Sequence, residues 1–407
     1  MSSRTESPIR PAQSFLLYLV MCWGVIASLA YNAIPALPAA GVLAVLGVAA
    51  YTTLPLFAFL SRGGGWRRYP TAWFRLAVVR PVLYGQLLLP FVTVSAIAGI
   101  VLGAFAGQAV VAGRIAALIT LAVGAVVLVM GWVGSRALVI REVEATVPGL
   151  PASFDGLRIA QVSDTHMGPQ TSTCFMDNVT RALHRLQPDV VTITGDLVDD
   201  RAEDVDVFAH WLSTLTTTNA NGHTPEVYLI PGNHDVYAGW YAVAHGLRRQ
   251  TTARLLVNES TIVQRNGERL AIVGIGDPAG KRSASPDSPA PDIPRALSLV
   301  PADVPVIAFA HNPALWPALA EHGVALTLSG HTHWGQLAFP RRGWSLASPF
   351  LEHAMGVFQR GDSLLYVHPG TGFWGIPFRL GALPEIAVVT LRRGEESSIA
   401  MGKARAA

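Results

Sequence analysis

Apolar and polar positions alternate in short blocks along the second half of the chain. Five apolar blocks rich in Val, Ile and Leu have the length of buried strands, and each of them stops at a polar block. These five predicted strands are Leu157–Val162, Val190–Ile193, Val227–Ile230, Val304–Ala310 and Val324–Ser329. Between the first two, Phe175, Val179, Leu183 and Leu186 recur at helical spacing. The pattern predicts an α/β domain, and about 260 residues suffice for one sizeable core.

The first third of the chain has a different pattern, with four apolar stretches that contain no charged residue. They are Phe15–Ile34, Ala39–Leu60, Val82–Ala104 and Ile115–Gly134. Each is close to the roughly 20 residues that a helix needs to cross the hydrocarbon core of a bilayer. Buried helices of a soluble domain are the alternative, and a cleaved signal peptide would explain only the first stretch. We therefore expect an all-α region of four transmembrane helices.

This change of pattern sets the expected domain boundaries. Residues 1–141 are expected to form the four-helix transmembrane anchor and residues 142–395 the α/β domain. Residues 396–407 are expected to be a disordered tail, because this end is rich in Gly, Glu, Ser and Ala. The segment Gly280–Pro294, which is rich in Ser, Pro and Asp, is either a tolerated surface insertion or a lid.

Positive charge is concentrated in the apolar third. Residues 1–141 hold ten arginines, no lysine and one acid, Glu6, which gives a charge of +9. The whole chain carries +3, so residues 142–407 carry −6. A pI near 9.0 raises the question of nucleic acid, but the positive charge lies outside the α/β domain. Nucleic acid is therefore disfavoured as a substrate, and the sequence identifies no protein partner.

Polar blocks at the ends of the predicted strands hold groups that can bind metal. They are Asp164–His166, Gly195–Asp199, Gly232–Asp235, His311–Pro313 and Gly330–His333. The strand ends would deliver these carboxylates, imidazoles and amides to one edge of a sheet. Oxygen and nitrogen donors without a thiol suit divalent metals such as Mn, Fe or Zn, and seven such donors exceed what one ion needs.

The five blocks resemble the calcineurin-like metallophosphoesterases, whose pattern is D-x-H, G-D-x-x-D, G-N-H-[DE], a lone His and G-H-x-H. The resemblance covers about residues 145–395. An isolated Asp or His at a strand end is more often a turn former than a ligand, but five blocks in order overturn that expectation. Ser163–His166, Gly330–Gln336 and Gly372–Leu380 are similar to the branch of membrane-linked or exported bacterial phosphohydrolases. The resemblance implies two facing mixed β-sheets flanked by helices, the four-layer metallophosphoesterase fold.

The resemblance also implies a binuclear metal centre. The residues implied for one ion are Asp164, His166 and His333, with Asp196 as the bridge. The residues implied for the other ion are Asn233, His311 and His331, with the same bridge. Two cations roughly 3.5–4 Å apart can share a hydroxide that attacks phosphorus, and they neutralise charge on the phosphoryl oxygens. The expected cofactors are therefore two divalent ions, Mn, Fe or Zn.

Three polar residues beside the ligands have other expected roles. His234 directly follows Asn233 and cannot easily bind the same ion, and the resemblance makes it the general acid for the departing alkoxide. Asp235 could raise the pKa of His234 or fix its orientation. Asp199 follows Asp196 at a spacing that would let it orient a liganding histidine.

Two further residues leave alternatives open. Trp334 stands where relatives commonly have Gly, and its indole could cover the metal site, touch the substrate or pack in the core. His368 precedes the late Gly-rich block, where the resembling branch carries a different short sequence. A structural role and a site role both remain open for His368.

The implied function is metal-dependent hydrolysis of a phosphomonoester or phosphodiester. A membrane anchor would concentrate bilayer substrates, and Arg341, Arg342 and Trp344 in the segment Pro340–Phe350 could touch lipid headgroups. A phospholipid or lipid-linked phosphate is the working hypothesis for the substrate. Ordinary surface arginines on a structured loop are an equal alternative.

Two functions of other classes are also considered. A membrane sensor or scaffold could bind metal or a phosphorylated ligand without turnover, although the complete ligand set and His234 argue against a degenerate site. A transporter could use the four spans as a path. The uncharged spans disfavour it, because transport pathways usually retain buried ionisable groups.

The arginines predict the orientation of the chain in a bacterial inner membrane. Those between the second and third apolar stretches are Arg62, Arg67, Arg68, Arg75 and Arg80. The connections on the opposite side contribute only Arg114, so the positive-inside rule places both termini and the α/β domain in the cytoplasm. A C-terminal reporter that works in the cytoplasm should be active, and one that requires export should be silent. The reverse pair of results would contradict this orientation.

Overall fold

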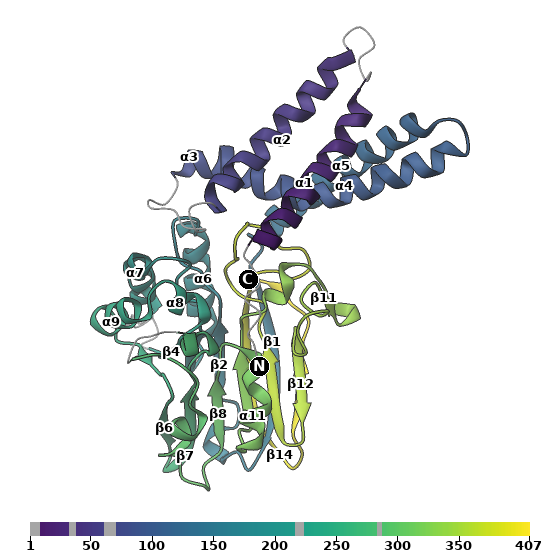
Figure 1. Ribbon diagram of the computed structural model, residues 1–407. Helices are drawn as coiled ribbons and strands as arrows, with labels where there is room; N and C mark the ends of the chain where they lie inside the picture. The colour runs from purple at the N-terminus through teal and green to yellow at the C-terminus, as the bar shows by residue number, and fades with distance from the viewer. Residues whose placement is uncertain (1–8, 32–37, 61–70, 216–223, 283–286) are drawn as a thin grey trace, which may run out of the picture. The chain divides into compact units, whose positions relative to one another are not determined.

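Two compact units make up the part of the chain that the structure describes. The computed structural model describes residues 9–31, 38–60, 71–215, 224–282 and 287–407 (Figure 1). The units are Met1–Val129 and Met130–Ala407, and the second contains every predicted ligand. Of the predicted insertion or lid, residues 283–286 lie outside the described residues.

Helices make up the first unit, and the last of them continues into the second unit. Their bounds are Ile9–Ala30 (α1), Pro38–Leu60 (α2), Ala72–Phe74 (α3), Arg80–Ala104 (α4) and Ala109–Gly134 (α5), with a π-helical turn at Arg75–Val79. Among the described residues, Arg75–Ala104 and Ala109–Gly134 are long and apolar enough to cross a membrane. The apolar parts of α1 and α2 are shorter, so the region of four spans stays a prediction.

An eight-stranded mixed sheet forms one layer of the second unit. Its strands are β1 (Val139–Pro148), β2 (Arg158–Val162), β3 (Val190–Thr194), β4 (Glu226–Ile230), β5 (Arg254–Leu255), β14 (Glu385–Gly394), β15 (Ser398–Met401) and β16 (Arg405–Ala406). Their order is β15-β1-β14-β2-β3-β4-β5, with β16 also beside β1. Because β2, β3 and β4 are parallel, their carboxyl ends meet at one edge of the sheet.

A six-stranded mixed sheet forms a second layer. Its strands are β6 (Glu259–Arg265), β7 (Glu268–Gly274), β8 (Val306–Phe309), β9 (Leu326–Ser329), β12 (Gly356–Arg360) and β13 (Ser363–Val367). They lie in the order β12-β13-β9-β8-β7-β6, and β7, β8, β9 and β13 are parallel. A short hairpin, β10 (Ala338–Phe339) and β11 (Trp344–Ser345), lies outside both sheets. The five strands predicted from apolar blocks are confirmed as β2, β3, β4, β8 and β9.

The two sheets face each other across a shared apolar core. Ile159 and Tyr228 of the first sheet pack with Leu270, Phe309 and Leu328 of the second. The helices of this unit are α6 (Thr173–Leu186), α7 (Val205–Leu215), α8 (Asn233–Tyr237), α9 (Trp240–Gln250), α10 (Ile293–Leu297) and α11 (Trp316–Glu321). α6, α7 and α9 cover the outer face of the first sheet, and α10 and α11 cover the second (Figure 1). The predicted pair of mixed sheets flanked by helices is confirmed.

The α/β unit extends beyond the predicted boundaries at both ends. At its start, β1 begins at Val139, before the predicted boundary at residue 142. At its end, the prediction of a disordered tail at 396–407 is corrected, because β15 pairs with β1 and β16 extends the ladder. Ile399 and Met401 of β15 pack against the core. Composition hid this strand because its other two residues, Ser398 and Ala400, are exposed.

Candidate metal centre

Loops that follow five parallel strands form the site. The strands β2, β3 and β4 of the first sheet and β8 and β9 of the second each end one or two residues before one of the predicted polar blocks begins. Backbone hydrogen bonds fasten the loops together, since Asp164 N–H donates to Gly195 O and Gly330 N–H donates to His311 O, both at 3.0 Å. The site therefore lies where the ends of both sheets meet.

The backbone of the predicted ligands adopts an uncommon conformation. Left-handed φ angles occur at Asp164 (52°), His166 (42°), Asp196 (50°), His331 (72°) and His333 (49°). Residues other than Gly rarely adopt this region, at a cost of about 1–3 kcal/mol each, and they persist only where surrounding contacts hold them. Such strain concentrates at functional sites, and the loops that carry it here also carry the predicted ligands.

Two glycines let the loops approach the buried carboxylates. A Cβ at Gly330 would overlap Ser163 Oγ and the Asp164 carboxylate, and a Cβ at Gly232 would overlap Asp196. These overlaps give a physical reason for the glycines that open the G-H-x-H and G-N-H-D blocks.

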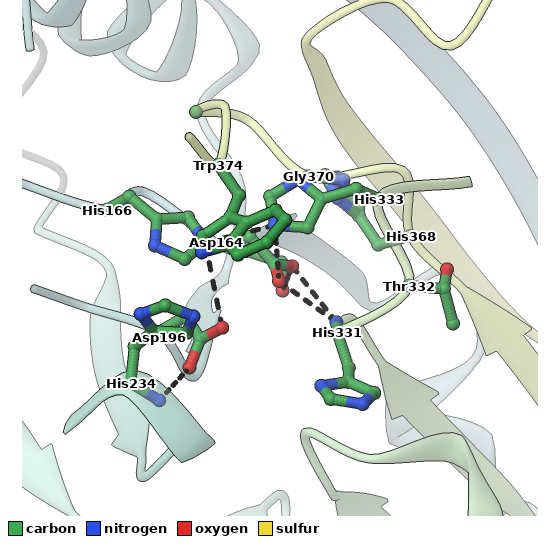
Figure 2. Close-up of polar contacts among 12 residues, drawn as sticks. Asp164, His166, Asp196, His234, His331, Thr332, His333, His368, Gly370 and Trp374 are labelled. Atoms are coloured by element: carbon green, nitrogen blue, oxygen red, sulfur yellow. Dashed lines mark hydrogen bonds and ion pairs between the residues drawn. The ribbon is translucent and has the colours of Figure 1, made fainter. Parts of the chain in front are cut away.

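One group of donors surrounds Asp164. Asp164, His166, Asp196 and His333 are buried, and each offers a donor atom within 4.8 Å of the others. His166 Nε2 lies 3.0 Å from His333 Nε2 and 3.6 Å from Asp196 Oδ2. His333 Nε2 lies 3.4 Å from Asp164 Oδ1, and Figure 2 shows these side chains converging.

A second group of donors shares Asp196 with the first. His311 Nε2 lies 3.2 Å from Asp196 Oδ2 and 3.2 Å from Asn233 Oδ1. His331 Nδ1 lies 2.8 Å from the same Asn233 oxygen. Asp196 Oδ2 thus contacts a histidine from each group, which is the position expected of a bridging carboxylate.

The two donor sets fit divalent cations. Metal–ligand bonds of about 2.0–2.2 Å leave neighbouring donor atoms roughly 3–3.5 Å apart, and the contacts in both groups lie in or near that range. His311 Nδ1 donates to Thr194 O at 2.8 Å, which turns Nε2 toward Asp196 and Asn233. Each group can therefore offer lone pairs to an ion.

Burial and charge set the protonation of the donors. Burial opposes ionisation of Asp196, but the neighbouring His311, His166 and His234 outweigh it and hold the pKa of Asp196 well below its usual range. For Asp164 burial prevails and raises the pKa. Burial and the charge of His311 lower the pKa of His331 to about 4, so its ring is neutral near pH 7 and can act as a ligand.

His234 lies beside both groups and has a raised pKa. Its backbone N–H donates to Asp196 Oδ1 at 2.8 Å (Figure 2), and its Nδ1 lies 3.0 Å from Asp199 O and 3.7 Å from Asp200 Oδ1. Burial opposes protonation of the ring, but the nearby Asp200 carboxylate, the charges of Asp196 and Asp199 and the contact with Asp199 O outweigh it. Together they raise the pKa of His234 to about 9, so the ring holds a proton near neutral pH.

Asp235 does not have the predicted role beside His234, and this prediction is corrected. Its buried carboxylate accepts hydrogen bonds from the N–H groups of Gly232 at 2.8 Å, Leu197 at 2.9 Å and Val198 at 3.1 Å. Consecutive residues of a helical turn project in different directions, so Asp235 points away from the His234 ring. It fastens the loop after β4 to the loop after β3.

Two other carboxylates contact the site histidines. Asp199 Oδ1 lies 3.3 Å from His166 Nδ1, which is the contact expected of a group that orients a liganding histidine. Asp200 faces His234 and was not singled out from the sequence. An acid that follows another acid at a strand end carries no periodic signal, so only the fold could identify Asp200.

The alternatives for Trp334 and His368 are decided by burial. Trp334 is 1% exposed, and its Nε1–H donates to Val367 O at 2.8 Å, so it packs in the core. His368 is fully buried, and its Nδ1 accepts a hydrogen bond from Gly370 N–H at 2.9 Å within the turn that follows β13. Both residues therefore have a structural role in the interior next to the site loops.

Trp374 is a site residue that the sequence did not reveal. Its ring lies 6.1 Å from the His234 ring, centroid to centroid, and 54% of the residue is exposed. The Gln336 side chain accepts from Trp374 N–H at 2.9 Å and donates to Trp374 O at 3.1 Å. Trp374 therefore lies near His234 and is partly open to solvent.

Replacing Asp200 should change the protonation of His234. In the metal-stripped protein, Asp200→Asn should lower the pKa of His234 from about 9 toward its ordinary value of 6.5, because a neighbouring negative charge is removed. Histidine ring ¹⁵N NMR titration would measure this shift, with His234→Gln to assign the signal. An unchanged pKa would mean that Asp196 and Asp199 alone hold the proton.

Comparisons with known proteins agree with this geometry. Residues 157–335 match a family described as calcineurin-like phosphoesterase. The chain is 32% identical over 263 residues to a Danio rerio protein named transmembrane protein with metallophosphoesterase domain, which covers 62% of this chain and 57% of the relative. It is 33% identical over 238 residues to an uncharacterized metallophosphoesterase of Helicobacter pylori, covering 58% and 60% of the two chains.

The matched region is limited in length. The chain spans a little over half the length of the two relatives. A Thermus thermophilus protein of known crystal structure matches 53% of this chain and 90% of its own length, at 14% identity and a TM-score of 0.34. Over residues 157–335 the chain thus matches the calcineurin-like phosphoesterase family, and this range holds all five polar blocks of the site.

Proposed function

We propose that this domain hydrolyses a phosphomonoester or phosphodiester with two divalent metal ions, Mn, Fe or Zn. The observation that carries the proposal is the position of Asp196. Its Oδ2 lies 3.6 Å from His166 Nε2 and 3.2 Å from His311 Nε2, between two sets of donors. A shared carboxylate between two such sets suits a pair of ions better than a single one.

The proposed roles follow from the contacts of each side chain. The residues that would hold the ions are Asp164, His166, Asp196, Asn233, His311, His331 and His333. When bound, the ions would neutralise the phosphoryl oxygens and lower the pKa of an attacking water. His234, protonated near neutral pH, would donate its proton to the leaving oxygen, and Asp199 would keep the His166 ring in place.

The role of His234 can be tested by changing the leaving group. With an alkyl phosphoester, His234→Ala should lower kcat by about 10²–10⁴-fold, because the departing alkoxide needs a proton. With a nitrophenyl ester the loss should be much smaller, because nitrophenolate leaves without one. Steady-state kinetics of the full chain in detergent, stripped of metal and resupplied with Mn, Fe or Zn, would measure both.

Two further variants complete this experiment. Asp196→Ala should abolish metal-dependent turnover, and His245→Ala, an exposed histidine on α9, should leave it unchanged. Metal binding without hydrolysis of any monoester or diester would contradict the proposal. That result would favour the alternative, a membrane sensor or scaffold that binds metal or a phosphorylated ligand without turnover.

We further propose that the protein is an integral membrane protein whose substrate is a phospholipid or a lipid-linked phosphate. α4 and α5 expose large apolar side chains, including Leu102 and Leu118. In the α/β unit, Phe350 is 80% exposed, and Arg341 and Arg342 are exposed near it in the chain. Exposed aromatic and basic side chains suit an interface with anionic headgroups.

The lipid proposal predicts a difference between two substrates. Replacing Arg341 and Arg342 together by Gln should slow hydrolysis of a phospholipid in anionic proteoliposomes by on the order of tenfold, because each Arg near a charged surface contributes about 1 kcal/mol. Hydrolysis of a soluble diester should not change. The matched control is the pair Arg248 and Arg249 at the end of α9. Activity toward soluble diesters but toward no phospholipid would contradict the proposal.

A further inference from the structure

Two exposed aromatic rings lie beside His234. Tyr237 is 61% exposed and Trp374 is 54% exposed. Their ring centroids lie 5.6 Å and 6.1 Å from that of the His234 ring, and the ring planes cross at 65° and 68°. The residue proposed as the proton donor therefore has aromatic neighbours from two segments that are distant in the chain.

Tyr237 is carried by the same short helix as His234. α8 spans Asn233–Tyr237, and residues three positions apart in a helix share a face. The His234 N–H donates to Asp196 Oδ1 at 2.8 Å, and Asp235 accepts hydrogen bonds from three backbone N–H groups. These bonds hold the helical turn, so the Tyr237 backbone keeps its place relative to His234.

Trp374 lies on a loop that two of the ligand-bearing blocks hold in place. The Gln336 side chain, three residues after His333, donates to Trp374 O at 3.1 Å and accepts from Trp374 N–H at 2.9 Å. Gly372 N–H donates to Asp164 O at 3.0 Å. A Cβ at Gly372 would lie 2.6 Å from that oxygen, so glycine is needed for this close approach. The exposed indole is therefore attached to a well-held backbone.

The exposure of Trp374 contrasts with that of other tryptophans in the same unit. Four of them are at most 5% exposed, namely Trp211, Trp240, Trp316 and Trp334. An aromatic ring left in water forgoes the stabilisation that burial would give. Exposed aromatic side chains on a held loop beside a site indicate a surface that contacts a ligand.

The position of the rings indicates which part of a substrate would contact them. A proton donor must lie within hydrogen-bond reach of the leaving oxygen, so the rest of the leaving group would extend beside Tyr237 and Trp374. Asp200 is largely exposed, and its Oδ1 lies 3.7 Å from His234 Nδ1. Its negative charge disfavours an anionic leaving group at this place. An uncharged alcohol with an apolar carbon skeleton suits the two rings.

We propose that Tyr237 and Trp374 form the leaving-group subsite and select phosphoesters whose departing alcohol has an apolar skeleton. This inference rests on the proposed function, because it takes His234 as the proton donor. It deepens that function by naming the chemistry of the group that leaves. The alcohol of a lipid phosphate and a small free alkyl alcohol share this chemistry.

The binding of alkylphosphonates tests the subsite without turnover, because their C–P bond replaces the ester bond that would be cleaved. Ethyl-, butyl- and hexylphosphonate would be titrated by calorimetry into the full chain in detergent, loaded with Mn²⁺. Affinity should rise about tenfold from the ethyl to the hexyl compound, because each methylene removed from water adds up to about fourfold and the rings cover only part of the chain. Trp374→Ala should reduce this rise to about threefold and leave the affinity for ethylphosphonate unchanged.

Further variants separate the subsite from general damage to the fold. Trp374→Phe keeps a smaller ring and should retain most of the rise, and Tyr237→Ala combined with Trp374→Ala should remove nearly all of it. The matched control is Tyr241→Ala, because Tyr241 is 66% exposed on α9. It should leave the rise unchanged. An unchanged rise in Trp374→Ala, or an equal loss of affinity for all three phosphonates, would overturn the proposal.

A cationic ligand tests the apolar assignment against its main competitor. Aromatic rings beside a carboxylate can also bind a quaternary ammonium group. The neutral 3,3-dimethylbutylphosphonate should bind at least as tightly as the 2-(trimethylammonio)ethyl compound of the same shape. Tighter binding of the cationic compound, lost in Trp374→Ala, would overturn the apolar assignment.

Hydrolysis of three esters separates the two sources of the alcohol. Slower cleavage of phosphatidic acid by Trp374→Ala in proteoliposomes, by about threefold, would identify a lipid alcohol. Slower cleavage of soluble hexyl phosphate alone would identify a small free alcohol. Glycerol 3-phosphate lacks an apolar skeleton, so an equal slowing of its cleavage would overturn the subsite.

The proposed function and this inference fail in different ways. If the protein hydrolyses esters but alkyl length does not change phosphonate affinity, the subsite alone is overturned. If the predicted dependence on alkyl length is found without hydrolysis of any ester, the proposed function fails and the two rings still contact the alkyl group. If no phosphonate binds, both are overturned.

Discussion

The buried carboxylate of Asp196 is the constraint on which the site depends. Its Oδ2 contacts His166 and His311 from the two donor groups, and its Oδ1 accepts the His234 N–H. A charge without solvent must be compensated by neighbouring charges and hydrogen bonds. The surrounding histidines supply this compensation, as the lowered pKa of Asp196 indicates. The same concentration of charge makes the site a place where cations would bind.

The fold meets this constraint by bringing the ends of two sheets together. Parallel strands from both sheets end at the site, so their loops can supply donors from opposite sides. Left-handed backbone angles aim the ligands inward, and glycines leave room for the carboxylates. Asp235 then fastens two of these loops through three backbone N–H groups. The bonds that hold the loops also hold the predicted ligands in place.

A further set of residues contacts the site histidines on the side that faces away from Asp164 and Asp196. Asp199 contacts the back of His166, Arg379 contacts the back of His333, and Thr194 O accepts from His311. Each contact limits rotation of one ring. Arg379 also hydrogen-bonds through its backbone to the last turn of α5. This apolar helix and the site therefore share a structural element within the second unit.

The sequence by itself determined the strands and the identity of the ligand candidates. Apolar blocks with polar ends are local signals, and a strand must place its next residues at the edge of a sheet. Side-chain direction depends instead on loop geometry and on neighbours distant in the chain. Only the tertiary structure decided that Asp200 faces His234 while Asp235 points into the core, and that Trp334 is buried. It also decided that β15 completes the first sheet, because a short, half-exposed strand is recognisable only once β1 is there to pair with it.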